Sequence, residues 1–202
     1  MGIFSKIDRY HGSDESANLM NMEEFGIPKR SLFTETEILS LRHKITITDE
    51  YDNVCYYAET KFPSLHDKTE IYDASGNHIA HFERKLFSIH QRHFVNMTGG
   101  CDFELSTEIL HLVKDIINIE GLGWQIRGNV LGLNFQIYDS ADNVIAVIAQ
   151  KMLSLHDRYC IDIYMPEYER EIVTILITLQ HIIRDRQASA SSGSSSSSSA
   201  SK

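Results

Sequence analysis

The sequence has few cysteines, no long apolar run and no excess of positive charge, and each absence argues against a class of protein. Its three cysteines, Cys55, Cys101 and Cys160, are odd in number and lack CxxC spacing, so they suggest neither a disulfide framework nor a zinc site. No uninterrupted apolar run approaches the roughly 18 residues that a membrane-spanning helix needs, and no signal peptide is recognised at the start. We therefore expect a cytoplasmic protein.

A basic surface is also missing. The formal net charge is -9 and the pI is near 5.5, which argues against a nucleic-acid-binding protein. The hydrophobic fraction of 42 % is enough for one domain with a real core. We expect that domain over residues 31–187, a mobile arm over 1–30 and a disordered Ser-rich tail over 188–202, with arm and tail dispensable for the fold.

Recognisable catalytic patterns are absent too. No serine lies in a nucleophile elbow, no cysteine has a base in a known pattern, and the carboxylates fall in predicted turns. Three of the ten histidines, His66, His90 and His156, occupy equivalent places in a repeat, which explains them better than a metal site with converging ligands. We expect no enzyme activity, no cofactor and no metal.

The sequence does contain a repeat. Residues 49–53, 73–77 and 139–143 all read Asp-x-x-Gly/Asp-Asn. Asp can hydrogen-bond the backbone two residues on, and Gly, Asp and Asn tolerate positive φ, so each block predicts a turn. The block at 139–143 lacks the ligand spacing of a calcium loop. Runs rich in Ile, Val, Tyr, Phe and Thr flank the blocks, so each copy predicts a β-hairpin.

A lysine follows the first Asp of each block by 12 residues, and strand alternation places it on the outward face. If successive hairpins pair, these lysines form a patch with the arginines that follow them, and the patch could bind an anionic headgroup. Alternatively, lysines at strand ends protect the sheet edges. The candidate positions are Lys61, Lys85, Arg92, Lys151 and Arg158.

Three other segments complete the prediction. Residues 103–119 fit either a helix or two strands joined by a loop, and we favour strands because the flanking elements are β. Four glycines within 121–132 predict sharp bends or close backbone contacts, and a phosphate loop is disfavoured because no helix follows. Residues 166–184 predict a helix that is apolar nearly all round, which must be buried inside a barrel.

Four features occur in a characteristic order: Lys-x-x-Ser-Leu at Lys61 and Lys151, Ile-Tyr-Asp at 71–73 and 137–139, residues 120–124, and the apolar closing helix. Together, over residues 36–186, they resemble the LURP-one-related proteins, specifically the bacterial YxjI-like branch. The resemblance implies the tubby-like fold, a closed antiparallel β-barrel of about 12 strands around a central C-terminal helix. Phospholipid scramblases and tubby C-terminal domains share that fold.

The resemblance transfers a fold better than a function, so three function classes stay open. The first is a binding or scaffold module whose outer face meets anionic lipid, at a membrane periphery, or a protein. The second is an intracellular ligand-binding barrel, which requires that the helix leave the lumen open. The third is a scramblase-like lipid protein, which ranks last because the membrane anchor and cysteine cluster of those relatives are missing.

Overall fold

The computed structural model describes residues 25–35, 44–61, 68–84, 92–106, 116–151 and 158–192. These residues form twelve strands, a short 3-10 helix and a long C-terminal α-helix. The elements are β1 (Arg30–Glu35), β2 (Lys44–Thr48), β3 (Val54–Lys61), β4 (Lys68–Asp73), β5 (His78–Arg84), β6 (Arg92–Met97), β7 (Phe103–Ser106), β8 (Ile116–Ile119), β9 (Trp124–Asn129), β10 (Asn134–Tyr138), β11 (Val144–Lys151), β12 (Arg158–Ile163), η3 (Pro166–Tyr168) and α3 (Glu169–Ser192).

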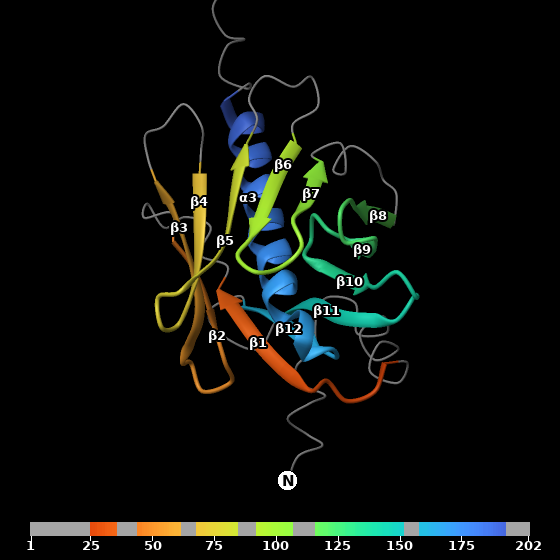
Figure 1. Cartoon of the computed structure of the whole chain (residues 1–202). Helices are drawn as coiled ribbons and strands as arrows, with labels where there is room; N and C mark the ends of the chain where they lie inside the picture. Colours follow the sequence, from red (N-terminus) through yellow and green to blue (C-terminus); the bar gives the residue numbers. More distant parts are fainter. Residues whose placement is uncertain are drawn as a thin grey trace, which may run out of the picture.

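The strands form one antiparallel sheet that curls around α3 (Figure 1). Its order is β7-β6-β5-β4-β3-β2-β1-β12-β11-β10-β9-β8, so β1 joins the two halves by pairing with β2 and with β12. The two ends meet at one bridge, in which the Glu104 backbone N–H donates to the Glu120 carbonyl at 2.9 Å. The molecule is therefore a nearly closed, mainly β barrel, as predicted.

The three repeated blocks form the same turn. Asp73 Oδ1 accepts hydrogen bonds from the backbone N–H groups of Ser75 and Asn77, and Asp73 Oδ2 accepts one from the Asn77 side chain, each at 2.9 Å. Residues 49–53 and 139–143 repeat all three bonds. The fourth residue of each block has positive φ: Asp52 (63°), Gly76 (82°) and Asp142 (68°). The hairpin prediction is confirmed.

The hairpins also share a β-bulge. The register shifts between Ile47 and Thr48, between Ile71 and Tyr72, and between Ile137 and Tyr138, always just before the turn aspartate. A bulge adds one residue to one strand and changes which side chains share a face. Strict alternation from the sequence therefore fails at this point of each hairpin.

The glycine-rich segment bends where the sequence predicts. Gly128 has φ +117°, and a Cβ built there would lie 2.9 Å from the Asn134 carbonyl oxygen on the paired strand. Strands β8 and β9 flank Gly121 and Gly123, so a strand and not a helix follows this turn. Trp124 is buried and packs edge-on against Tyr168, with ring centroids 5.1 Å apart.

Residues 103–119, which fit either a helix or two strands, form a strand at each end, β7 and β8, as favoured. The residues between them, 107–115, lie outside the described part of the chain.

The C-terminal helix lies lengthwise within the barrel (Figure 1). It follows η3, which begins at Pro166, and it continues to Ser192, beyond the predicted end at Arg184. The helix thus extends into the segment 188–202 that the sequence predicts to be disordered, and residues 193–202 lie outside the described chain. Extending an established helix needs no new nucleus, and alanine favours it, so Ala188 and Ala190 can continue it.

One outer face of the barrel is covered. Val147 and Ala149 point away from α3, yet they are buried and pack with Phe25 and Tyr164. The Phe25 and Tyr164 rings meet edge-on at 6.3 Å between centroids. The Lys29 backbone N–H also donates to the Ile163 carbonyl at 2.9 Å, so residues 25–29 contact the sheet.

Candidate functional site

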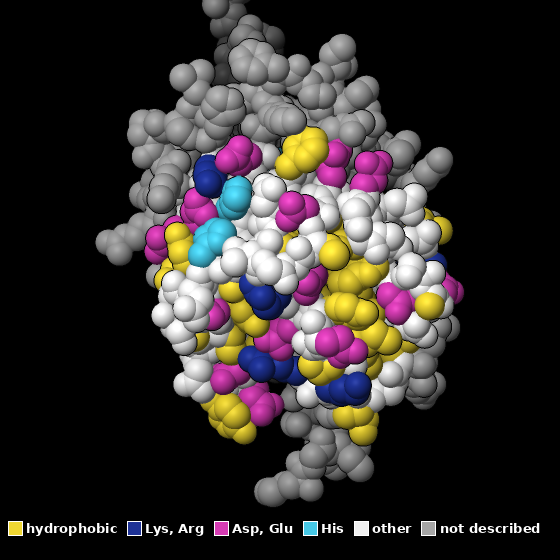
Figure 2. Space-filling view, in the orientation of Figure 1, with side chains coloured by type: hydrophobic (Ala, Val, Ile, Leu, Met, Phe, Trp, Pro, Cys, Tyr) yellow, Lys and Arg dark blue, Asp and Glu magenta, His cyan; other side chains and the backbone are white. Residues whose placement is uncertain are grey.

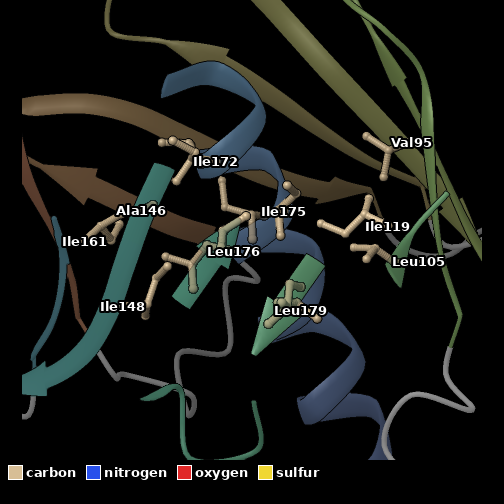
Figure 3. Close-up of a cluster of buried hydrophobic side chains, with 14 of the residues drawn as sticks. Val95, Leu105, Ile119, Ala146, Ile148, Ile161, Ile172, Ile175, Leu176 and Leu179 are labelled. Atoms are coloured by element: carbon tan, nitrogen blue, oxygen red, sulfur yellow. The ribbon is translucent and has the colours of Figure 1, made fainter. Parts of the chain in front are cut away.

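Side chains of α3 fill the interior of the barrel. Every residue from Ile172 to Leu179 is fully buried. Figure 3 shows Leu176 directed toward Ala146, Ile148 and Ile161, and Ile175 directed toward the strands on the other side. One polar residue of α3 has partners in the wall: His181 Nε2 lies 3.0 Å from Thr60 Oγ1 and 3.3 Å from Thr69 Oγ1.

Four of the five predicted patch residues lie in the described chain, all at strand ends. Lys61 ends β3, Arg92 begins β6, Lys151 ends β11 and Arg158 begins β12, whereas Lys85 lies outside the described residues. Backbone register brings one pair together, because Lys151 is the direct partner of Arg158. Strands β2, β1 and β12 separate β3 from β11, and β4 and β5 separate β3 from β6.

Several other basic side chains already have acidic or carbonyl partners. Figure 2 shows acidic side chains interspersed among the basic ones on the visible face. The contacts are Arg30 Nε to Glu169 Oε2 at 3.0 Å, Lys68 Nζ to Glu70 Oε1 at 3.1 Å, Arg127 to Asp142, and Arg170 to the Thr98 carbonyl at 2.8 Å. The three that pair with carboxylates are partly neutralised, and the Arg170 guanidinium donates to a neutral carbonyl, so all four are less available to a mobile anion.

A buried carboxylate marks the point where the helix enters the barrel. Glu169, the first residue of α3, accepts a hydrogen bond from Tyr56 Oη at 2.7 Å and pairs with Arg30. Burial raises the pKa of Tyr56 above its ordinary value of 10, and the hydrogen bond to Glu169 adds to that increase. The anion also lies at the positive end of the helix dipole. This network ties β1 and β3 to α3.

A second polar cluster lies on the outer face of β4 and β5 and consists of Glu70, His78 and His81. One potential ligand atom from each residue lies within 4.8 Å of the others. His78 Nε2 is 2.7 Å from Glu70 Oε2, and His78 Nδ1 is 2.8 Å from Thr98 Oγ1. We call these three residues the Glu-His-His cluster.

The surroundings of Glu70 favour its ionised form. Burial would raise the pKa of Glu70, but hydrogen bonds from Lys68 and His78 outweigh burial and hold the pKa below its ordinary value of 4.5. The Glu70 side chain is only 12 % exposed, against 34 % for His78. Two adjacent histidines are visible in Figure 2, and the other described histidines, His93 and His181, are buried.

Sequence reasoning missed this cluster because it followed the repeat. His66, His90 and His156, the histidines in equivalent places, all lie outside the described residues. His78 and His81 are three residues apart, which in a regular strand places them on opposite faces. The turn block is the signal that could have placed His78. In each copy the second strand of the hairpin begins at the residue directly after the block, which is His78 in the second copy.

Comparison with known proteins gives one family. The family model described as LURP-one-related matches residues 30–180. Among solved structures, a protein from Arabidopsis thaliana is similar at 15 % identity and a TM-score of 0.46, over 75 % of this chain and 92 % of that one. The curated proteins include no match. Within the described residues, no helix is both long and apolar enough to cross a membrane.

Proposed function

The chain belongs to the LURP-one-related family, and from that premise we propose that it is a non-enzymatic binding or scaffold module that works in the cytoplasm through its outer surface. The observation that carries this proposal is the filled interior. Ile172 to Leu179 are fully buried against the wall, so α3 occupies the space that a ligand-binding barrel keeps open. A partner must then bind to the outer surface of the barrel.

The ligand chemistry that the backbone register supports best is an anionic phospholipid headgroup at Lys151 and Arg158. Like charges directly opposite each other on neighbouring strands destabilise a sheet, and a bound phosphate would relieve that repulsion. Glu35 is the backbone register partner of Arg158 on its other side. Each surface cation near an anionic membrane contributes about 1 kcal/mol, so two give weak, salt-sensitive binding.

Flotation with phosphoinositide-containing liposomes, in EDTA and at low ionic strength, tests the proposal. We expect the chain to float, the floated fraction to fall with added salt, and Lys151→Glu/Arg158→Glu to abolish flotation. The comparison variant is Lys61→Glu, three strands away, which should retain most of the binding if the pair is the site. Absence of flotation by the unmodified chain would exclude the lipid and leave a protein partner for the same outer surface.

A further inference from the structure

The Glu-His-His cluster owes its shared face to the bulge in the second hairpin. Glu70 pairs directly with His81 across β4 and β5, and Tyr72 pairs with His78, while Ile79 has no register partner on β4. The extra residue turns the backbone, so Ile79 and Ala80 are both buried, whereas His78 and His81 are both partly exposed. Three potential metal ligands from two strands thereby converge outside the barrel.

The distances suit a single ion after small side-chain movements. Ligand atoms around a four-coordinate ion, with bonds of about 2.0–2.2 Å, lie about 3.3 Å apart. The 2.7 Å distance between His78 Nε2 and Glu70 Oε2 must increase by about half an ångström. The ring nitrogen of His81, which lies within 4.8 Å of the other two ligand atoms, must move closer to them. His78 and His81 are partly exposed, so ordinary rotamer changes can supply these movements.

The neighbours of the cluster orient its donors. Without a metal ion, His78 Nε2 can donate to Glu70 Oε2. If the ring proton moves to Nδ1, it can donate to Thr98 Oγ1 at 2.8 Å, and the Nε2 lone pair is then available to an ion beside Glu70. Lys68 contacts Oε1 of Glu70 and leaves Oε2 facing the histidines. The Tyr72 ring packs edge-on against His78 at 5.6 Å between centroids. Hydrogen bonds to the outer side of metal ligands are the usual way in which proteins fix such ligands.

The other two hairpins provide an internal comparison, because they have the same turn and the same bulge. Counting from the turn, the positions of Glu70, His78 and His81 correspond to Thr46, Val54 and Tyr57 in the first hairpin and to Gln136, Val144 and Val147 in the third. Neither set offers a histidine or a carboxylate. The shared architecture therefore does not require these residue types, which occur together in one copy.

We propose that Glu70, His78 and His81 bind one divalent transition-metal ion. Two imidazoles and one carboxylate suit ions such as Zn²⁺, Cu²⁺ and Ni²⁺, and three protein ligands leave at least one position for water or a further ligand. This proposal differs from the prediction made from the sequence, which expects no metal site and considers only the histidines His66, His90 and His156. It does not depend on the lipid proposal, whose assay is run in EDTA.

Zn²⁺ titration of the full chain by calorimetry tests the site, with the Co²⁺ visible spectrum as a second readout. We expect one Zn²⁺ per chain, with a Kd that rises at least tenfold in Glu70→Gln, in His78→Ala and in His81→Ala, and loss of the Co²⁺ bands in each. Val54→Ala, at the equivalent position of the first hairpin, is the matched control and should leave both readouts unchanged.

The double variant His78→Ala/His81→Ala retains eight of the ten histidines and reports binding elsewhere on the chain. Zn²⁺ binding of equal affinity in this variant would overturn the proposal, since the ion would then lie elsewhere. Absence of Zn²⁺ binding by the unmodified chain would also overturn it and leave a hydrogen-bonded contact between His78 and Glu70. Melting curves recorded without metal establish that each variant is folded.

Discussion

At the scale of residues, the first aspartate of each repeated turn accepts three hydrogen bonds that stabilise its ionised form. The side-chain amide of Asn53 lowers the pKa of Asp49, and that of Asn77 lowers the pKa of Asp73. At Asp139 desolvation opposes the shift, but hydrogen bonds from Asn143 outweigh it and the pKa is again lowered. The three turns are therefore sensitive to acid.

These shifts predict how stability depends on pH. Because the folded pKa values lie below the ordinary value of 3.8, the turn contribution is complete above about pH 4 and is lost as the pH falls through the folded values. We expect Asp49→Asn/Asp73→Asn/Asp139→Asn to melt at a temperature that depends less on pH between 2 and 4 than that of the unmodified chain. Melting curves followed by circular dichroism measure this, and identical slopes would contradict the argument.

At the scale of elements, α3 is the centre of the core. Its buried residues pack against strands from both halves of the sheet, which pair with each other through β1 and β12 and otherwise meet at one bridge. Leu176 is fully buried. The wall strands have their own hydrogen bonds, but in the described part of the chain α3 is the element that covers their inward apolar faces.

A charge within α3 should therefore unfold the barrel. We expect Leu176→Asp to lower the free energy of unfolding by at least about 5 kcal/mol, since it removes a buried side chain and leaves an unpaired carboxylate in an apolar site. The corresponding decrease in Tm is roughly 10 °C or more. The control is Glu167→Gln, an exposed residue just before α3 that should change Tm little. An unchanged Tm in Leu176→Asp would refute the central role of the helix.

At the scale of the whole molecule, the barrel depends on contacts made by residues 25–30, which lead into β1 and include its first residue. Phe25 covers Val147 and Ala149, and Arg30 pairs with the buried Glu169. The sequence alone predicts that the arm and tail can be removed without loss of fold. In the structure, residues 25–29 of this arm contact the sheet.

Two truncations separate these contributions. A chain of residues 25–192 should melt close to the full-length protein, whereas a chain of residues 31–187 should keep the fold but melt several degrees lower. The shorter chain exposes Val147 and Ala149 and leaves Glu169 without Arg30, changes that together cost about 2 kcal/mol or more. Equal melting temperatures for both truncations would show that residues 25–30 contribute nothing.

The site illustrates where sequence reasoning stops. Lys61 and Lys151 do end strands, which the 12-residue spacing indicates, whereas Arg92 and Arg158 begin the next strands and do not lie in turns. The sequence cannot say that β12 and not another strand pairs with β11. The Glu-His-His cluster was missed because a bulge changes the face of His78. A bulge depends on the register of two strands, and alternation within one strand carries no information about it.

The sequence by itself determined the features whose bonds are local. The turn aspartates bind groups within four residues, the bends at glycine follow from backbone sterics, and the apolar surface of residues 166–184 requires burial wherever the helix lies. Only the tertiary structure decided that β1 pairs with β12, about 130 residues away, that Glu104 meets Glu120, and that Phe25 covers the outside of β11. Those contacts arise between segments whose proximity is set by the closed sheet and its helix together, so no single segment encodes them.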